Sequence, residues 1–273
     1  MEKVKLKIVF LALVILAIAL LSYLTYEHNS VCIKEHKLRN KKIGKKIKIV
    51  HISDVHDRVF GKNNLGIIEK IKKQNPDYIA VTGDVLDNPH SDIKPMVFLM
   101  GELSKITKTF YVTGNHDDPI TNPLADNFME EIESKGVIVL NHESKVVNNI
   151  SFIGIEDNLL SDKETVNGNL KNIISNCPAN SYKVLLIHEP QFFDIYVNNK
   201  VDLVLTGHTH GGFLRVPFSR YALYAPGQGL FPKYTKGIYK EDGTTMIVNA
   251  GLGASVLPIR VNNRPEVVSI SID

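Results

Sequence analysis

Five short motifs rich in aspartate and histidine are spread over more than half of this 273-residue chain. In chain order, their chemically active groups are Asp54 and His56; Asp84; Asn115, His116 and Asp117; His188; and His208 and His210. Each motif follows a short apolar run, at residues 47–52, 78–81, 110–112, 184–187 and 203–205. Such runs are typical of buried strands. Because open α/β sheets bind ligands where their strands end, we expect these groups to meet at one place.

The spacing within the motifs suits metal chelation. In an extended segment, residues two apart project to the same side, so Asp54 can bind one ion together with His56. His208 and His210 repeat that spacing. One such pair alone would be weak evidence, but two pairs together with three further strand-end motifs predict a hydrolytic site for two metal ions. Imidazole, carboxylate and amide ligands without thiolate favour Mn²⁺, Fe, Zn²⁺ or Co²⁺ over Mg²⁺ or Ca²⁺. Manganese or zinc is the preferred interpretation.

The charge balance of this site predicts chemistry on phosphate. Two divalent ions bring four positive charges, and only Asp54 and Asp84 return negative ones, so the site keeps a net positive charge that attracts phosphate. A bound ion lowers the pKa of water from 15.7 to roughly 7, and two ions ~3.5–4 Å apart clamp a transferring phosphoryl group. Hydroxide then attacks phosphorus in line with the leaving oxygen. A protonated His116 would stabilise the leaving group or the phosphoryl oxygen.

On these motifs the chain resembles the calcineurin-like metallophosphoesterases, from residue 47 to 210 and more loosely to 272. The resemblance implies a four-layer α/β/β/α sandwich. It also implies one metal bound by Asp54, His56, Asp84 and His210, and another bound by Asp84, Asn115, His188 and His208. Asp84 would bridge the two ions. His116 would face the substrate phosphate, and Asp117 would orient the His116 ring.

Each of these residues also has a simpler interpretation. Asp54 and Asp84 are compatible with helix caps or turns, Asn115 with a turn, and His188 with a core histidine. Asp117 is nearly as well explained as a helix cap. Arg58 and Asn63, with the neighbouring Lys62 and Asn64, are candidates for substrate contacts, and solvated loop residues are an equal alternative. His51, His90 and His142 lack the chelating spacing and are interpreted as non-ligands.

The N-terminus predicts a membrane anchor. Residues 8–24 contain a single polar residue, Ser22, and follow three lysines. This run is at the short end of the ~17–25 residues that span a bilayer. A cleaved signal peptide is the alternative, but no small-x-small site follows the run. The lysines favour a cytoplasmic N-terminus and an extracytoplasmic catalytic domain, although seven further lysines and Arg39 at 34–48 compete from the other side. Those later charges would alternatively hold the domain near anionic headgroups.

Composition and the alternation of strand-like with helical stretches predict one domain after the anchor. We divide the chain into a basic tail and transmembrane anchor (1–24), a polar connection with a possible edge strand (25–46) and a metallophosphoesterase domain (47–273). A net charge of +3 gives no reason to expect nucleic acid as a partner. Cys32 and Cys177 are more readily two unrelated thiols than a disulfide. Oligomeric state is not indicated.

Secondary-structure patterns agree with an α/β class. Helices are predicted at 63–74, 92–107 and 124–135, alternating with the first three apolar runs in a βαβ rhythm. Strands at 137–140, 145–147, 150–155, 244–248 and 266–270 have short connections that favour antiparallel or mixed pairing. Residues 213–240 show no clear period, and a connection of that length is usually functional. Within it, Tyr221, Tyr224, Phe231 and Tyr234 would form an apolar or membrane-facing rim, or else a local minicore.

The membrane-anchored bacterial branch of the family offers the best likeness, including UDP-2,3-diacylglucosamine pyrophosphohydrolases and related envelope phosphoesterases. The likeness rests on residues 207–212, 224–227, 251–253, 258–260 and 265–266, while Phe213 departs from the Gln common there. It implies hydrolysis of a phosphate ester or pyrophosphate in a membrane-associated, possibly lipid-linked substrate. A phosphodiesterase or phosphatase for soluble nucleotides is the competing enzyme hypothesis. A metal-binding scaffold without catalysis is the non-enzyme hypothesis, and His116 argues against it.

Overall fold

The computed structural model describes residues 2–87, 89–157, 162–215, 221–253 and 260–273. Its first sheet has six strands in the order β1-β15-β2-β3-β4-β5. Their bounds are β1 Cys32–Leu38, β15 Glu266–Ile272, β2 Ile47–Ile52, β3 Tyr78–Thr82, β4 Thr109–Val112 and β5 Ile138–Val139. Strands β2 to β5 are parallel neighbours, and β15 is antiparallel to β2. The carboxyl ends of β2 to β5 therefore lie along one edge.

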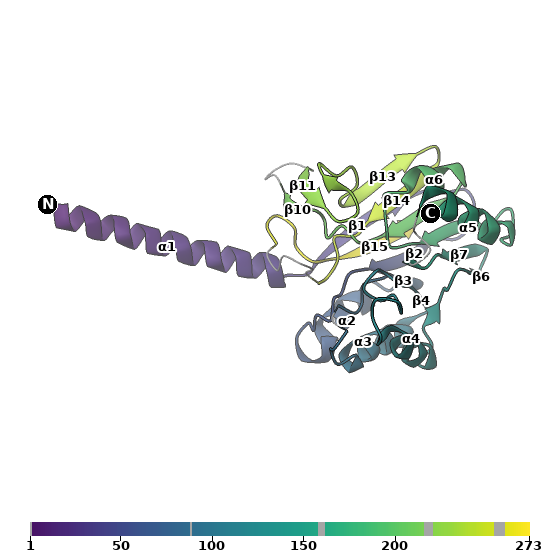
Figure 1. The fold of residues 1–273 in the computed structure, drawn as a ribbon, viewed down its shortest axis with the longest axis horizontal. Coiled ribbons are helices and arrows are strands. Elements are labelled where there is room, and N and C mark those ends of the chain that lie inside the picture. Colours follow the sequence, from purple (N-terminus) through teal and green to yellow (C-terminus); the bar gives the residue numbers. More distant parts are fainter. Residues whose placement is uncertain (1, 88, 158–161, 216–220, 254–259) are drawn as a thin grey trace.

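Helices cover one face of this sheet (Figure 1). They are α2 Leu65–Lys72, preceded by the short 3₁₀ turn η1 Lys62–Asn64, then α3 Lys94–Ile106 and α4 Ala125–Ser134. These three α-helices match those predicted from the sequence, each with slightly shorter bounds. The βαβ rhythm is confirmed.

The second sheet is mixed. Its strand order is β13-β14-β9-β8-β7-β6, with β7, β8, β9 and β14 parallel and an antiparallel strand at each edge. The bounds are β13 Gly237–Glu241, β14 Thr244–Val248, β9 Leu203–Thr206, β8 Tyr182–Leu186, β7 Ile150–Gly154 and β6 Ser144–Val147. Two helices absent from the sequence prediction, α5 Lys163–Ser175 and α6 Phe193–Asn198, belong to this half. The mixed pairing expected for the second half is confirmed.

Three apolar cores separate four layers. One lies between the first sheet and α2 to α4, and another between the second sheet and α5 and α6. The middle core joins the two sheets, with Phe110 of β4 stacked on Phe152 of β7 at a centroid distance of 4.0 Å. The α/β/β/α sandwich is therefore confirmed. Because the central strands are buried on both faces of their sheets, their sequences are continuous apolar runs.

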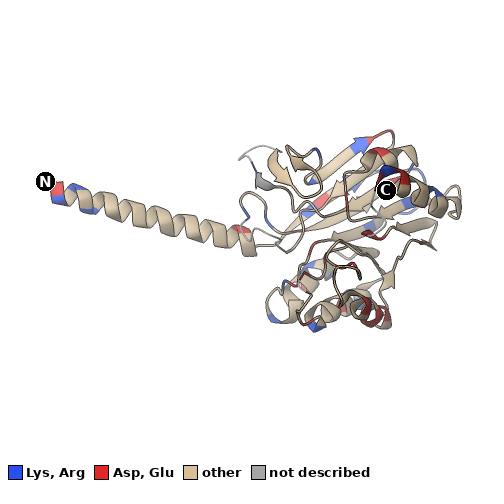
Figure 2. Ribbon diagram, in the orientation of Figure 1, with Lys and Arg blue, Asp and Glu red and all other residues tan. Residues whose placement is uncertain are grey.

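Helix α1 (Glu2–Asn29) projects from the body as a single long helix (Figure 1). It is the one helix of the described residues that is long and apolar enough to cross a membrane, and its apolar window is not buried. Figure 2 shows basic residues at its N-terminal tip and an uncharged length up to Glu27. The helix is a candidate membrane anchor.

The C-terminal end of α1 is hydrogen-bonded to the body. Glu27 is buried and accepts the backbone N–H of Asn263 at 3.0 Å. Arg58 donates to the carbonyl oxygen of His28 at 2.7 Å and to that of Leu252 at 3.1 Å. These contacts fix the helix end to the loop after β2 and to the loop that precedes β15.

The described part of residues 213–240 contains more regular secondary structure than its sequence indicates. It contains β10 Phe213–Arg215, β11 Ala222–Ala225 and β12 Gly229–Leu230, which form a small antiparallel sheet, and most of β13. Tyr234 does not belong to a rim, because it is buried against Phe193 in the outer core of the second sheet. Residues 258 and 259, part of a motif used above, lie outside the described residues. Both cysteines are free thiols, as expected.

Because Phe152 packs between the sheets, Phe152→Ala is expected to destabilise the protein by ~3–5 kcal/mol. The free energy of unfolding of the detergent-solubilised chain, measured by denaturant titration, checks this. Val146→Ala, on an exposed part of β6, is the matched control and should stay within about 0.5 kcal/mol of the parent. Equal effects of the two substitutions would contradict a core between the sheets.

Candidate metal centre

Loops at the carboxyl ends of five strands bring the predicted ligands together. Asp54 and His56 follow β2, Asp84 follows β3, Asn115 and His116 follow β4, His188 follows β8, and His208 and His210 follow β9. The loops also bind one another: the N–H of His56 donates to the carbonyl oxygen of Asp84 at 3.0 Å. Asp54 accepts the N–H of His208 at 3.0 Å, which joins the first sheet to the second.

Glycines allow the loops to approach this closely. A Cβ on Gly114 would lie 2.3 Å from Oδ1 of Asp84, and one on Gly207 would lie 1.9 Å from Oγ of Ser53. Neither position can hold a side chain without moving the loops apart. This explains why a glycine stands before the Asn115-His116 motif and before the His208-Thr209-His210 motif.

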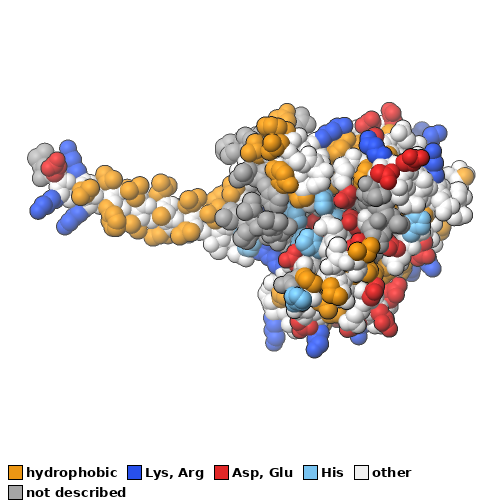
Figure 3. All heavy atoms as spheres, viewed as in Figure 1, with side chains coloured by type: hydrophobic (Ala, Val, Ile, Leu, Met, Phe, Trp, Pro, Cys, Tyr) orange, Lys and Arg blue, Asp and Glu red, His pale blue; other side chains and the backbone are white. Residues whose placement is uncertain are grey.

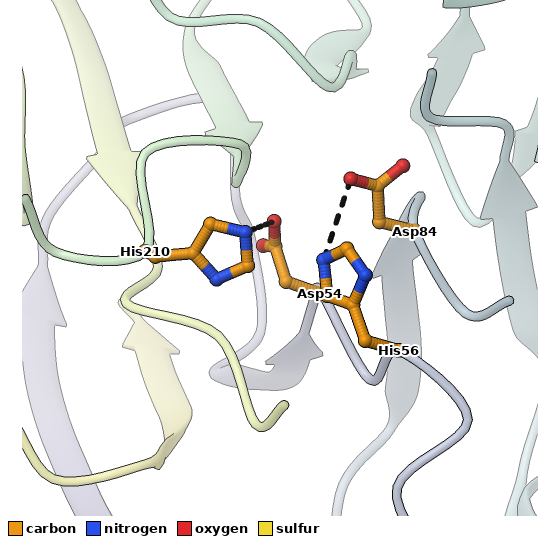
Figure 4. A group of neighbouring side chains, drawn as sticks. All are labelled: Asp54, His56, Asp84 and His210. Carbon is orange, nitrogen blue, oxygen red and sulfur yellow. Dashed lines mark ion pairs between the residues drawn. The ribbon is translucent and has the colours of Figure 1, made fainter. Parts of the chain in front are cut away.

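Two groups of side chains form the candidate metal centre. The first contains Asp54, His56, Asp84 and His210, and the second contains Asp84, His188 and His208. In each group the potential ligand atoms lie within 4.8 Å of one another. Figure 4 shows the first group, with His210 facing Asp54 and His56 facing Asp84. Asp84 belongs to both groups, which is the position expected of a bridging ligand.

Individual separations suit ligands of a common cation. Nε2 of His188 lies 3.1 Å from Oδ2 of Asp84, and Nε2 of His56 lies 3.5 Å from the same oxygen. Nε2 of His210 lies 3.6 Å from Oδ1 of Asp54. Ligand atoms at ~2.0–2.2 Å from one ion are separated by distances of this order. Asn115 joins the second group through its Oδ1, which is 3.0 Å from Nδ1 of His208.

Hydrogen bonds on the outer side fix the tautomers of two imidazoles. Nδ1 of His188 donates to the carbonyl oxygen of Thr82 at 2.7 Å, and Nδ1 of His56 donates to Oδ1 of Asp87 at 2.8 Å. Each ring therefore turns its Nε2 toward Asp84, the orientation that a metal-binding histidine needs. Both Nε2 atoms are buried without a hydrogen-bond partner among the described residues. Because buried polar atoms are rarely left unpaired, these residues fit a pair of bound cations.

The electrostatics also favour cations. Asp54 and Asp84 are 0% and 1% exposed, and burial raises the pKa of Asp54. Burial lowers the pKa of His208 to about 3 and lowers that of His210, so both rings are neutral and available as ligands at neutral pH. Burial opposes the charged form of His188 as well, yet Asp84 and Asp54 together raise its pKa. The buried carboxylates thus attract positive charge.

Backbone strain is concentrated at the same residues. Asp54, His56, Asp84, His208 and His210 all have positive φ angles, between 49° and 67°. This region of backbone space is uncommon for residues other than glycine. Such strain persists where the surrounding structure enforces it, and it is frequent at functional sites.

Asp117 does not orient the His116 ring, contrary to the sequence prediction. Its buried carboxylate accepts the N–H groups of Val85 and Leu86 and the hydroxyl of Tyr111, at 2.7–3.0 Å. It therefore holds the loop after β3 in place. The carboxylate beside His116 is that of Asp87, with Oδ1 3.4 Å from Nδ1 of the ring. Asp87 follows Asp84 by three residues, and this second acid was the signal that sequence reasoning missed.

His116 is the partly exposed member of the site. Its side chain is 34% exposed, whereas those of His56 and His188 are fully buried. Its backbone N–H donates to Oδ1 of Asp84 at 2.9 Å. Its ring lies edge-on to the ring of His56, with the ring centroids 4.9 Å apart. The ring is therefore held next to the metal-binding groups and remains accessible to a substrate.

The two candidate substrate contacts lie elsewhere, and His51 is not a ligand, as expected. Arg58 is engaged with the end of α1, so its predicted substrate contact gives way to a structural one. Asn63 is exposed in η1 and belongs to neither group of potential ligands. His51 is a core histidine that contacts the Thr82 hydroxyl at 2.8 Å. Glu189, which sequence reasoning missed, approaches Nε2 of His208 at 3.9 Å, and burial raises its pKa to about 7.

A two-sheet sandwich with shared Asp and His ligands at its strand ends defines a metallophosphoesterase. Residues 47–212 match the family model described as calcineurin-like phosphoesterase. The chain belongs to this family.

Named relatives agree with the assignment. The chain is 28% identical over 229 residues to the uncharacterized metallophosphoesterase YkuE of Bacillus subtilis, covering 82% of this chain and 78% of the relative. It is 28% identical to Phosphodiesterase YaeI of Escherichia coli, covering 82% of each chain. A zebrafish (Danio rerio) transmembrane protein with a metallophosphoesterase domain is 26% identical, covering 82% of this chain. The chain spans 52% of that relative and 60% of a matching Helicobacter pylori protein.

Solved structures support the fold. The crystal structure of the protein TT1561 from Thermus thermophilus aligns with a TM-score of 0.51 and 14% sequence identity. The alignment covers 77% of this chain and 92% of that one. At such identity the likeness concerns the fold alone.

Since Asp84 is shared by both groups, Asp84→Asn should remove most bound metal. Elemental analysis of the purified full-length protein, expressed with Mn²⁺ or Zn²⁺, measures the metal content. Asp126→Asn, at an exposed position in α4, is the control and should bind as much metal as the parent. Full metal content in Asp84→Asn would contradict a shared ligand.

Asp87 fixes the His56 ring, and loss of such outer partners lowers metal affinity by about 10–100-fold. Asp87→Ala is therefore expected to release metal at chelator concentrations that leave the parent loaded. Competition with a chromogenic chelator gives the affinity. Asp87→Asn, which retains an oxygen acceptor, should be affected less than Asp87→Ala; the reverse order would argue against this role.

Proposed function

We propose that this protein hydrolyses phosphate ester or pyrophosphate bonds with two divalent cations held by seven side chains. They are Asp54, His56, Asp84, Asn115, His188, His208 and His210. The proposal rests on the buried carboxylate of Asp84, because the two sets of imidazoles share it. When bound, the two ions supply a nucleophile at neutral pH and stabilise the phosphoryl oxygens. The ligand set suits Mn²⁺, Fe, Zn²⁺ or Co²⁺, and we propose manganese or zinc from this group.

The chain's own residues bind and orient the substrate. His116 is accessible beside the two groups, so its ring is the one placed to contact a phosphoryl or leaving-group oxygen. Asp87 holds that ring from the other side. Asp117, Val85 and Leu86 keep the loop after β3 rigid, which maintains the distance between Asp84 and His116. No nucleophilic side chain is needed.

We propose further that the protein is membrane-anchored and acts on a membrane-associated phosphoester, with its catalytic domain on the extracytoplasmic side. The length and exposure of α1 support the anchor, and the basic N-terminal tip supports this orientation (Figure 2). The name of the E. coli relative favours a phosphodiester. A membrane anchor raises the local concentration of substrates in the bilayer. A net charge of +3 does not favour nucleic acid as a partner.

His116→Ala tests the proposed activity, because loss of an acid or charge-stabilising group costs about 10²–10⁴-fold in rate. The metal-loaded variant is expected to hydrolyse bis-p-nitrophenyl phosphate about 10²–10⁴-fold more slowly than the parent. Its metal content should be unchanged. His36→Ala, on the edge strand β1, should keep the parent rate. Parent-level turnover by His116→Ala, or none by the metal-loaded parent on mono- and diesters, would contradict the proposal.

A further inference from the structure

The small sheet and the residues next to it expose five large apolar side chains. These residues, here called the hairpin face, are Tyr221, Leu223, Tyr224, Leu230 and Phe231, which are 68%, 40%, 44%, 68% and 77% exposed. Tyr224 pairs with Leu230 across β11 and β12, and the N–H of Phe231 donates to the carbonyl oxygen of Leu223 at 2.9 Å. Where exposed apolar side chains gather on a protein surface, they mark contacts with another protein or with a membrane.

The hairpin face lies at the end of the body from which α1 leaves. Figure 1 places β10 and β11 there, and Figure 3 shows hydrophobic side chains gathered in the same region. Contacts connect the two parts: the hydroxyl of Tyr23 in α1 donates to Oδ1 of Asn262 at 3.0 Å. Lys236, which follows the hairpin, donates to Oδ1 of Asn263 at 3.1 Å. The 260–264 loop thus contacts both the helix end and the segment that follows the hairpin.

The length of α1 determines which occupant fits this face. The apolar run ends at Leu24 and the helix at Asn29, so the body begins about 8 Å beyond the apolar run. The headgroup region of a bilayer extends roughly 5–8 Å beyond the hydrocarbon on each side. If α1 spans the membrane, side chains at this end of the body reach the headgroups.

The residue types suit that environment. Tyrosine and other aromatic residues are favoured at the membrane interface, and leucine and phenylalanine insert at the boundary of the acyl chains. Lys233, exposed next to this face, is compatible with anionic headgroups. Tyr26, which is 55% exposed at the end of α1, adds a further interfacial aromatic.

The opposite end of the same hairpin contacts the metal centre. Gly227, in the turn between β11 and β12, has a φ of 68°, and a Cβ there would lie 3.1 Å from Nε2 of His208. The hairpin therefore extends from the candidate ligands to the end of the body nearest the anchor.

We propose that the hairpin face rests in the headgroup region of a phospholipid bilayer, and that the site takes an amphiphilic phosphoester from that bilayer. The second part rests on the proposed function and names its substrate class. Acyl chains stay in the membrane under Leu230 and Phe231, while the headgroup phosphate enters beside the Gly227 turn. The first part concerns binding alone and can be tested without activity.

The chain contains no tryptophan, so one introduced tryptophan reports its own surroundings. Full-length Phe231→Trp is reconstituted in phosphatidylcholine–phosphatidylglycerol vesicles, with and without bromine on the acyl chains. Val146→Trp is the control, because Val146 is 44% exposed on β6, at the end of the body away from α1 (Figure 1). Interfacial insertion predicts blue-shifted emission for Phe231→Trp and quenching by brominated lipid roughly threefold stronger than for the control.

Equal quenching of the two variants would overturn the bilayer contact. A blue shift without quenching would also overturn it, because protein, such as a second copy of the chain, would then cover the face. Leu230→Trp serves as the second reporter if Phe231→Trp lowers the melting temperature. The same outcomes apply to it.

The substrate class is tested with a matched pair of diesters that share one leaving group. A diacylglycerol p-nitrophenyl phosphodiester is embedded in the vesicles, and bis-p-nitrophenyl phosphate is supplied in solution. Leu230→Ser/Phe231→Ser should lower the ratio of embedded to soluble turnover about tenfold, equivalent to about 1.4 kcal/mol. Val146→Ser/Phe98→Ser, at two exposed positions outside the hairpin, should keep the parent ratio. An unchanged ratio in the hairpin variant would overturn the substrate class. If the parent turned over neither diester, the proposed function would be overturned. The bilayer contact would still be decided by the quenching result.

Discussion

The carboxylate of Asp84 is withdrawn from water and faces the Nε2 atoms of two imidazoles. One percent of the residue is exposed, and the Nε2 atoms of His56 and His188 lie 3.5 and 3.1 Å from one of its oxygens. A buried charge without compensation is strongly unfavourable, so this carboxylate needs positive charge beside it. Cations at this position would satisfy the carboxylate and both nitrogens at once. Much of the surrounding structure can be understood as support for that arrangement.

The sandwich supplies this support because parallel strands from two sheets end at one place. β2, β3 and β4 bring the first sheet's residues, and β8 and β9 bring those of the second. Hydrogen bonds from His208 to Asp54, and between the loops after β2 and β3, hold the two sheets in register at the site. The positive φ angles of five candidate ligands show that local backbone preference has been overridden by these contacts. The middle core, with Phe110 stacked on Phe152, keeps the two sheets at a fixed separation.

Sequence patterns predicted reliably what is local. Apolar runs at the buried strands and the Asp-x-His and His-x-His spacings depend on short stretches of chain, and the five motifs do converge. Long-range partners were harder to predict. Asp117 stands next to His116 in sequence, yet it binds Val85 and Leu86, because the fold places the loop after β3 directly beside it. Asp87 takes the place beside His116 from 29 residues away, and Arg58 binds the end of α1 rather than facing the site. Such contacts are set by packing between loops, which periodicity does not encode.

The small sheet shows the same limit. Residues 213–240 lack a period because β10, β11 and β12 are only two to four residues long and the burial of β11 does not alternate. Tyr234 packs into a core while Phe231, three residues earlier, is exposed, and composition alone could not separate them.

We infer that the Asp84 carboxylate lies between two cations in the metal-loaded protein. Anomalous X-ray diffraction at the absorption edge of the bound metal, on crystals of the full-length protein grown with Mn²⁺ or Zn²⁺, tests it most directly. Two anomalous peaks ~3.5–4 Å apart are expected, one beside His56 and His210 and the other beside His188 and His208, with the Asp84 carboxylate bridging them. A single peak, or two peaks that do not share Asp84, would contradict it.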